Sequence, residues 1–248
     1  MKEKLYTIPV NEAFDNAGEC GFCTLHKKLE KEILDYVMGP SYMEEDIREE
    51  MDKMGFCKDH YRQMFLAGNR LGVALMLQSH LKKLNKDTEA LFQKELEQAS
   101  GKRRLFQKEE TGSPFCTYEE TLQNSCYACH RMEHRMDSYV DTFFHLWKSE
   151  TEFRDKVLEG KGFCMEHLKL ILLEGKKKLN AEKYRELLAA ILPLQTEHMK
   201  RLEEEVDWFI QKFDYRFKDE PWKNSKDAVE RGILKVSGTN LNEDGTGK

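Results

Sequence analysis

Apolar residues recur every three or four positions along most of the chain, which is the spacing of helices that bury one face. One such stripe ends at Gly39-Pro40, and its members are Leu25, Leu29, Ile33, Tyr36 and Val37. A second stripe comprises Met132, Met136, Tyr139, Val140, Phe143 and Trp147. The pattern predicts an all-α fold.

Short helices are expected after both stripes. Ser41-x-x-Glu44 and Ser149-x-x-Glu152 have the form of capping boxes, which open a helix with a serine hydroxyl. Gly55 and Gly162 are expected to end these short helices in the left-handed conformation that glycine adopts without strain.

Longer helices are predicted to follow the two glycines. One begins at Cys57 and reaches about Leu84, with a further helix over Thr88 to Ala99. Another begins at Cys164 and reaches about Leu179, and a long helix covers Ala181 to Phe213, where Pro193 should introduce a kink.

One cysteine motif is written twice. Cys20-Gly-Phe-Cys23 precedes Gly55-Phe-Cys57-x-x-His60, and Cys126-Tyr-Ala-Cys129 precedes Gly162-Phe-Cys164-x-x-His167 after a gap of similar length. Only Cys116 lies outside the pattern. We therefore expect a pseudo-duplicated helical bundle.

Each copy supplies three thiols and one imidazole, the ligand set of a closed tetrahedral zinc site. Cysteines at helix N-termini lose their protons more easily, which favours metal binding there. We expect two zinc ions per chain, each held within one repeat. The first set is Cys20, Cys23, Cys57 and His60, and the second is Cys126, Cys129, Cys164 and His167.

Other uses of these cysteines are less consistent with the pattern. Buried structural cysteines would not explain the paired histidines, and disulfides are rare in reducing compartments. A c-type haem would fit Cys126-Tyr-Ala-Cys129-His130 and leave Cys164 and His167 unused. An iron–sulfur cluster is the main competitor of zinc, because three cysteines and one histidine can also hold such a cluster.

The domain organisation follows the repeat. Residues 1–100 form the first helical repeat, 101–114 a charged linker, and 115–213 the second repeat. Residues 214–248 form an aromatic C-terminal extension that continues into a disordered tail from Ser237.

Composition limits the expected cellular location of the protein and the classes of partner that it can bind. Charged residues make up 34% of the 248 residues, and 40 basic against 45 acidic side chains give a net charge of −5. Such a chain lacks the phosphate-neutralising surface that nucleic-acid binding requires. It has no membrane-spanning apolar run and no signal peptide, which predicts a cytoplasmic protein without a membrane partner.

The function follows from the metal sites, because the sequence has no HExxH, nucleophile elbow or phosphate-binding glycine loop and assigns no catalytic residue. We expect a zinc-stabilised scaffold or regulatory module that binds a protein or small-ligand partner. The alternative is an iron–sulfur or thiol-based redox enzyme that uses the same ligands. His26, His130 and His134 follow the CxxC motifs and are given no role.

The duplicated motif, with Lys212-Phe-Asp-Tyr-Arg216 and Glu220-Pro-Trp-Lys-Asn-Ser225, resembles an uncharacterised family of cytosolic bacterial proteins found mainly in Firmicutes. The resemblance covers nearly the whole chain. It implies a bacterial cytosolic metalloprotein and brings no reaction with it.

Overall fold

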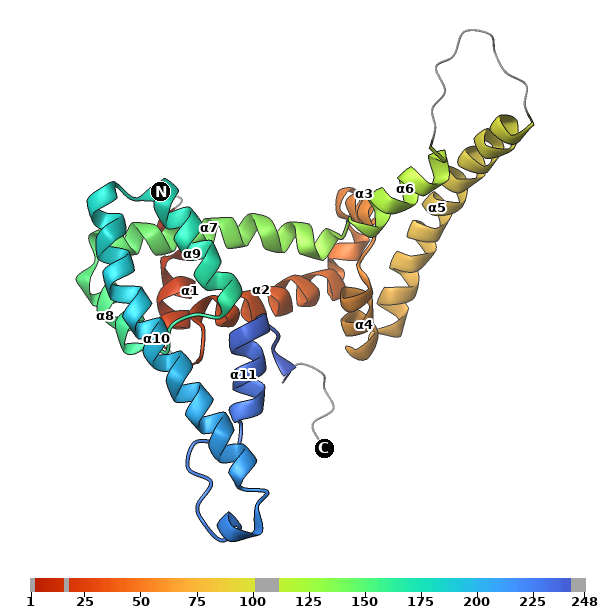
Figure 1. Cartoon of the computed structure of the whole chain (residues 1–248). Coiled ribbons are helices and arrows are strands. Elements are labelled where there is room, and N and C mark those ends of the chain that lie inside the picture. The colour runs from red at the N-terminus through yellow and green to blue at the C-terminus, as the bar shows by residue number, and fades with distance from the viewer. Residues whose placement is uncertain (1–2, 16–17, 101–111, 242–248) are drawn as a thin grey trace. The chain divides into compact units, whose positions relative to one another are not determined.

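The computed structural model is made of helices and describes residues 3–15, 18–100 and 112–241 (Figure 1). Over these ranges it contains eleven α-helices, two short 3-10 helices and no strand. The prediction of an all-α fold is confirmed. None of the described helices is both long enough and apolar enough to cross a membrane.

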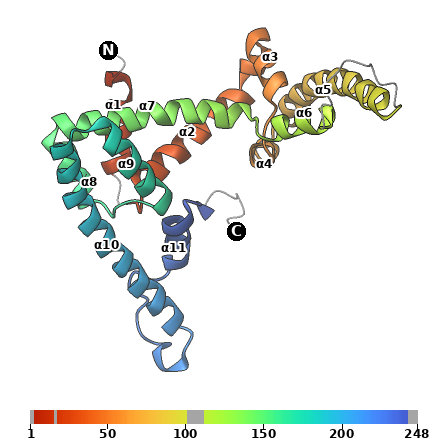
Figure 2. The same cartoon turned by 45° about the horizontal axis from the view of Figure 1, so that its top comes forward.

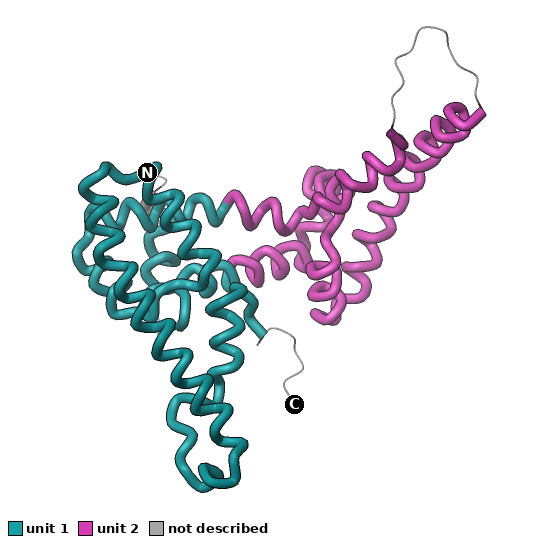
Figure 3. Tube along the Cα trace, viewed as in Figure 1, with its two compact units in different colours: residues 1–28, 135–248 teal, residues 29–134 magenta. Residues whose placement is uncertain are grey.

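The helices gather into two compact units (Figure 3). Unit 1 comprises residues 1–28 and 135–248, and unit 2 comprises residues 29–134. The boundaries fall within α2 (Gly21–Met38) and α7 (Tyr127–Ser149). The grouping differs from the expected halves, because the first 28 residues lie with the later helices. Most of the expected linker and the end of the expected tail lie outside the described residues.

Unit 1 contains the start of α2, most of α7, and six further elements. These are α1 (Glu3–Asp15), α8 (Thr151–Glu159), α9 (Met165–Lys178), α10 (Ala181–Gln211), the 3-10 helix η2 (Tyr215–Phe217) and α11 (Ala228–Ser237). The long helix α10 packs against both α9 and α11 (Figures 1 and 2). Pro193 lies inside α10.

Unit 2 contains the rest of α2, the start of α7, and five further elements. These are the 3-10 helix η1 (Pro40–Met43), α3 (Glu45–Met54), α4 (Lys58–Leu66), α5 (Arg70–Ala99) and α6 (Pro114–Gln123). The long helix α5 packs against α3 and, further along, against α6 (Figure 2).

Aromatic rings form the core of unit 1 around Phe143, whose side chain is fully buried. Its ring centroid lies 5.2 Å from that of Phe22 and 6.3 Å from that of Phe163. Phe22 belongs to the first CxxC motif and Phe163 to the second GFC motif. The core therefore fixes two cysteine-bearing segments that are far apart in sequence.

The two expected capping boxes do not form. α3 begins after Glu44 and α8 after Glu150, with no capping side-chain hydrogen bond at either residue. Ser41 donates instead to the carbonyl of Tyr36, and Ser149 to the carbonyl of His145 at 2.9 Å. Ser41 thus bonds to the end of α2, and Ser149, the last residue of α7, bonds within its own helix, as short polar side chains do readily at helix ends.

The helix predicted from Cys57 to Leu84 is interrupted, while the expected break before Thr88 is absent. α4 ends at Leu66, and Gly68 takes a positive φ of 89° before α5 begins at Arg70. Asn69 caps α5 by accepting from the backbone N–H of Gly72. Gly55 does end α3 with a φ of 62°. Gly162 has the expected positive φ of 77°, but α8 is capped two residues earlier, by Gly160.

Candidate metal centres

The eight predicted ligands form two groups, and the grouping is crossed between the repeats. Centre 1 consists of Cys20, Cys23, Cys164 and His167, and centre 2 consists of Cys57, His60, Cys126 and Cys129. Within each group the possible ligand atoms all lie within 4.8 Å of one another. The prediction that each centre lies within one repeat is wrong, because each combines the CxxC of one repeat with the CxxH of the other. Each centre lies inside one unit.

Helix starts position the ligands of centre 1. Cys20 precedes α2, and Cys23 lies in its first turn. Cys164 is the N-cap of α9, and its sulfur accepts from the backbone N–H of His167 at 3.4 Å. The expectation that the CxxH motifs begin helices is confirmed, since Cys57 is likewise the N-cap of α4.

The distances in centre 1 suit a single ion. The Nδ1 atom of His167 lies 3.5 Å from the sulfur of Cys20, 3.4 Å from that of Cys23 and 3.1 Å from that of Cys164. The sulfurs of Cys23 and Cys164 are 3.6 Å apart. Two sulfurs bound tetrahedrally at about 2.3 Å would be about 3.8 Å apart. Four donors therefore surround one point.

Centre 2 has the same geometry. The Nδ1 atom of His60 lies 3.2 Å from the sulfurs of both Cys57 and Cys126 and 3.5 Å from that of Cys129. The sulfurs of Cys57 and Cys129 are 3.9 Å apart. In both centres Nδ1 faces the sulfurs, so Nε2 is left to contact other protein groups.

Exposure distinguishes the two centres. All three cysteines of centre 1 are buried. In centre 2 only Cys126 among the cysteines is buried, and Cys57 and Cys129 are partly exposed. Water and small reagents therefore reach the sulfurs of centre 2 more easily.

Glu30 on α2 lies beside centre 2, and the sequence did not reveal it. Its Oε1 lies 3.2 Å from the Nε2 of His60 and accepts a hydrogen bond from Gln63 at 3.0 Å. A carboxylate beside the outer nitrogen of a ligand histidine fixes the ring and makes the inner nitrogen a better donor. Helical periodicity does not mark Glu30, because charged residues are common on helices.

Burial and the neighbouring ligand groups shift the pKa values of the thiols and of the imidazole. In centre 2 burial works against ionisation, yet the hydrogen bond with His60 lowers the pKa of Cys126 to about 6. Burial and the neighbouring sulfur of Cys126 raise the pKa of Cys129. For His60, burial lowers the pKa, but the hydrogen bond with Cys126 and the nearby carboxylate of Glu30 outweigh it and raise the value to about 10. A second positive charge would let the remaining sulfurs ionise, which is what a metal ion supplies.

Centre 1 shows the same competition. Hydrogen bonds with Cys20 and Cys23 lower the pKa of Cys164, and the hydrogen bond with Cys164 raises the pKa of Cys23. Burial lowers the pKa of His167, but its hydrogen bonds with Cys164 and Cys20 outweigh this effect and raise the pKa to about 10. Both donor sets therefore favour a cation at their middle.

Two buried side chains, Gln195 and His80, pack closely against the glycines of the two GFC motifs. An added Cβ at Gly162 would lie 2.7 Å from Oε1 of Gln195, and one at Gly55 would lie 2.8 Å from Nε2 of His80. Gln195 accepts from the backbone N–H of Phe163 at 2.9 Å and donates to the carbonyl of Phe163 at 3.0 Å. The Nδ1 atom of His80 lies 2.8 Å from the carbonyl of Asp52. α10 and α5 thus fix the loops that carry Cys164 and Cys57.

Replacing Gln195 with leucine should destabilise unit 1 by about 2–4 kcal/mol, because the buried N–H and C=O of Phe163 would each lose their partner. Chemical denaturation of the metal-loaded protein measures the change. Gln211→Leu on the same helix is the control, since Gln211 bonds only the exposed Asp207 carboxylate. Equal stabilities of the two variants would contradict the role of Gln195.

The other histidines after the CxxC motifs lie outside both centres. His130 and His134 are exposed on α7, with ring centroids 4.7 Å apart, and His26 is exposed on α2. Cys116 is exposed on α6 and belongs to neither centre.

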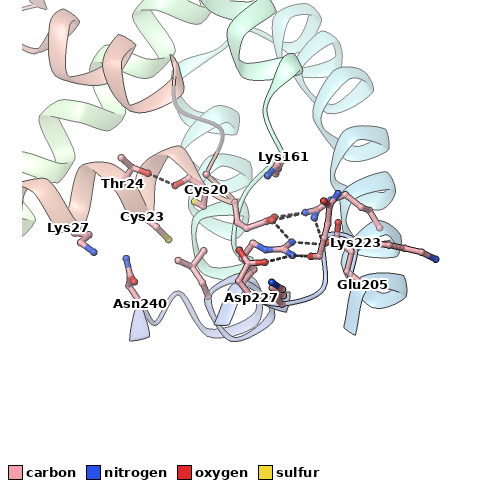
Figure 4. A pocket seen from close by; sticks show the side chains of 16 residues that line it. Cys20, Cys23, Thr24, Lys27, Lys161, Glu205, Lys223, Asp227 and Asn240 are labelled. Atoms are coloured by element: carbon pink, nitrogen blue, oxygen red, sulfur yellow. Dashed lines mark hydrogen bonds and ion pairs between the residues drawn. The ribbon is translucent and has the colours of Figure 1, made fainter. Parts of the chain in front are cut away.

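A cavity of about 700 Å³ lies against centre 1, and Cys20 and Cys23 form part of its wall (Figure 4). Much of the rest of the lining is charged, with side chains from α2, α10 and α11 and from the segments before α2, α9 and α11. They are Glu19, Lys27, Lys161, Arg201, Glu205, Lys223, Lys226, Asp227 and Arg231.

Comparison with known proteins gives a family and no function. The family described as a family of unknown function, DUF6062, matches residues 1–243. The chain belongs to this family. No curated protein and no solved structure matches it. Membership in the family supports the resemblance to an uncharacterised family and assigns no reaction to the two centres.

Proposed function

We propose that the protein is a metal-stabilised scaffold or regulatory module that holds two zinc ions, one at each centre. The observation that carries the proposal is the convergence of three sulfurs and one imidazole nitrogen at both centres, within 4.8 Å. Four protein ligands complete a tetrahedral site and leave no position for water or substrate, which is typical of structural zinc.

The spacing of the ligands favours a single ion over an iron–sulfur cluster. Ligands of a cluster bind different iron atoms and therefore lie further apart than ligands of one ion. Here the sulfur of Cys57 lies 3.9 Å from that of Cys129, and the sulfur of Cys23 lies 3.6 Å from that of Cys164. The alternative of an iron–sulfur or thiol-based redox enzyme has less support from this geometry.

The proposed location is the cytoplasm, where reducing conditions keep such thiols available for metal. All seven cysteines are free of disulfides in the structure. The proposed action is binding of a protein or a small ligand, for which the cavity beside centre 1 has a suitable size. A nucleic-acid partner is not proposed, since the net charge is −5.

Elemental analysis of protein purified without oxygen, with a visible spectrum, tests the metal assignment. We expect two zinc ions per chain and a colourless solution. A brown protein that contains iron and sulfide, and bleaches on reduction, would establish the alternative.

Cys164→Ser tests the crossed ligand sets. We expect the variant to lose one of the two ions, because three ligands hold zinc more weakly than four. Alkylation followed by peptide mass spectrometry should then label Cys20 and Cys23, while Cys57, Cys126 and Cys129 stay protected. Labelling of Cys126 and Cys129 instead would mean that each ion is held within one repeat.

Cys116→Ser is the matched control for this experiment, since Cys116 is exposed and lies outside both centres. It should keep both ions and leave all six ligand cysteines protected.

A further inference from the structure

A cluster of charged side chains lies next to centre 1, where α10 and α11 meet the segment before α2, and two of its members, Glu19 and Lys235, are buried. Nη2 of Arg201 lies 2.6 Å from Oε2 of Glu19, and its Nη1 lies 2.6 Å from Oε2 of Glu205. Nη1 of Arg231 contacts the same two carboxylates. The fifth member is Lys235, whose Nζ lies 3.6 Å from Oε2 of Glu19. We call these five residues the ion cluster.

The five residues of the ion cluster carry a formal excess of one positive charge when Lys235 is protonated. Three cations share two carboxylates, and the exposed side-chain fraction is 0% for Lys235, 3% for Glu19 and 13% for Glu205. Arg231 also contacts Asp227, but that side chain is 67% exposed, so water screens its charge. A buried charge without a partner is costly, so a further buried negative charge should lie nearby.

Centre 1 supplies a negative charge when it holds a divalent ion. Three thiolates and a neutral imidazole around such an ion give a total of minus one, which equals the excess of the ion cluster with opposite sign. The low exposure of Cys20, Cys23 and Cys164 limits the screening of that charge by water, although Cys20 and Cys23 border the cavity.

Lys235 connects the ion cluster to both ligand segments. Its Nζ donates to the carbonyl of Glu19 at 3.0 Å and to the carbonyl of Lys161. Glu19 directly precedes Cys20, and Lys161 lies three residues before Cys164. The end of α11 is close as well, since an added Cβ at Gly238 would lie 3.8 Å from the sulfur of Cys164.

We propose that Lys235 is a positioning residue that neutralises the metal–thiolate charge of centre 1, so that metal binding at this centre and the docking of α11 stabilise each other. The proposal rests on the metal binding proposed above. By linkage, a helix that strengthens metal binding is itself held more firmly when the metal is bound.

Centre 2 is built differently and serves as an internal reference. Its His60 lies beside the carboxylate of Glu30, and Cys57 and Cys129 are partly exposed to water. Solvent can therefore screen the charge of centre 2, and loss of Lys235 should leave that centre unchanged.

The cavity offers a second source of negative charge. Lys27, Lys161, Lys223 and Lys226 line it, and a bound anion such as phosphate would also balance the ion cluster. Lys235 does not line the cavity, and its donors point to the two ligand segments. The contacts of Lys235 therefore favour the metal centre over a cavity anion.

Lys235→Met tests the proposal by removing the charge and keeping an unbranched side chain. Zinc-loaded protein is titrated with a competing chelator, and ions are counted by native mass spectrometry. Cysteine alkylation identifies which centre has lost its ion. We expect zinc retention at centre 1 to fall at least about tenfold, as for other residues that support metal ligands, and retention at centre 2 to stay the same. Lys235→Arg, which keeps the charge, should retain more zinc at centre 1 than Lys235→Met.

Lys212→Met is the matched control, because Lys212 is also buried and its Nζ donates to the carbonyls of Phe217, Lys218 and Glu220. It should lower the stability of the fold without changing zinc retention at centre 1. If Lys235→Met and Lys212→Met retain zinc at centre 1 equally well, the proposal is wrong.

Hydrogen exchange tests the reverse direction of the coupling. Amides of α11 should exchange faster in Cys164→Ser, which loses the ion of centre 1, than in Cys126→Ser, which loses that of centre 2. Equal exchange of α11 in both variants would contradict the coupling.

Three further results separate this proposal from the alternatives. Wild-type protein that contains no metal would overturn the proposed function, whereas two bound ions with no effect of Lys235→Met would overturn only the role of Lys235. If inorganic phosphate stabilises wild-type protein but not Lys235→Met, and zinc retention is the same in both, the counter-charge is an anion in the cavity.

Discussion

Chelation of both metal ions should unfold the protein, with loss of most of its helical circular-dichroism signal. Structural zinc contributes on the order of 10–16 kcal/mol of apparent binding free energy in small zinc domains, more than the usual stability of a folded domain. Without an ion, the three thiols of each centre compete for ionisation, as the raised pKa values of Cys23 and Cys129 indicate. Each centre also joins segments that are far apart in the chain.

Circular dichroism and calorimetry with increasing chelator measure this effect. Readdition of zinc should restore the helical signal, and magnesium should not, because magnesium prefers oxygen ligands. A metal-free protein with full helicity and an unchanged melting temperature would contradict a structural role for the ions.

Phe143→Ala should be the most damaging single substitution in the core of unit 1, with a loss of about 3–5 kcal/mol. The side chain is fully buried, and its ring contacts those of Phe14, Phe22 and Phe153 within 5.5 Å. At about 2–4 °C per kcal/mol for a chain of this size, the melting temperature should fall by roughly 6–20 °C.

Phe213→Ala is the control, because that ring is 76% exposed. The melting temperatures of the two metal-loaded variants are measured by thermal unfolding and compared. A drop for Phe213→Ala as large as that for Phe143→Ala would show that the aromatic core around Phe143 does not dominate the stability of unit 1.

The eight candidate ligands could be identified from the sequence, but their grouping into two centres could not. CxxC and CxxH motifs mark the ligand types and the helix starts by short-range spacing alone. The partner of Cys23 was expected at Cys57, 34 positions away, and lies at Cys164 (164 − 23 = 141 positions). Loop-closure entropy grows only slowly with loop length, so proximity in sequence is a weak guide to pairing. The core decides it, because Phe22 and Phe163 pack on the same ring, that of Phe143.

The residues that support the candidate ligands could not be predicted from the helical spacing of apolar residues either. Glu30, His80, Gln195 and Lys235 have ordinary helical positions, and only the fold brings them to the metal-binding segments. The helix α1 was missed for a related reason. Pro9 lies inside it and its sequence is mixed in polarity, yet Phe14 packs into the aromatic core.

The ligands of centre 2 all lie in sequence between the two pairs that make up centre 1. A ribosome therefore completes centre 2 at Cys129, and it must add 38 residues (167 − 129 = 38) before His167 emerges. At roughly 5–20 residues per second this delay is about 2–8 s. If the centres bind metal as proposed, centre 2 can take up its ion during that interval. Centre 1 must wait for α9. If Lys235 acts as proposed, centre 1 reaches its full affinity only when α11 has left the exit tunnel.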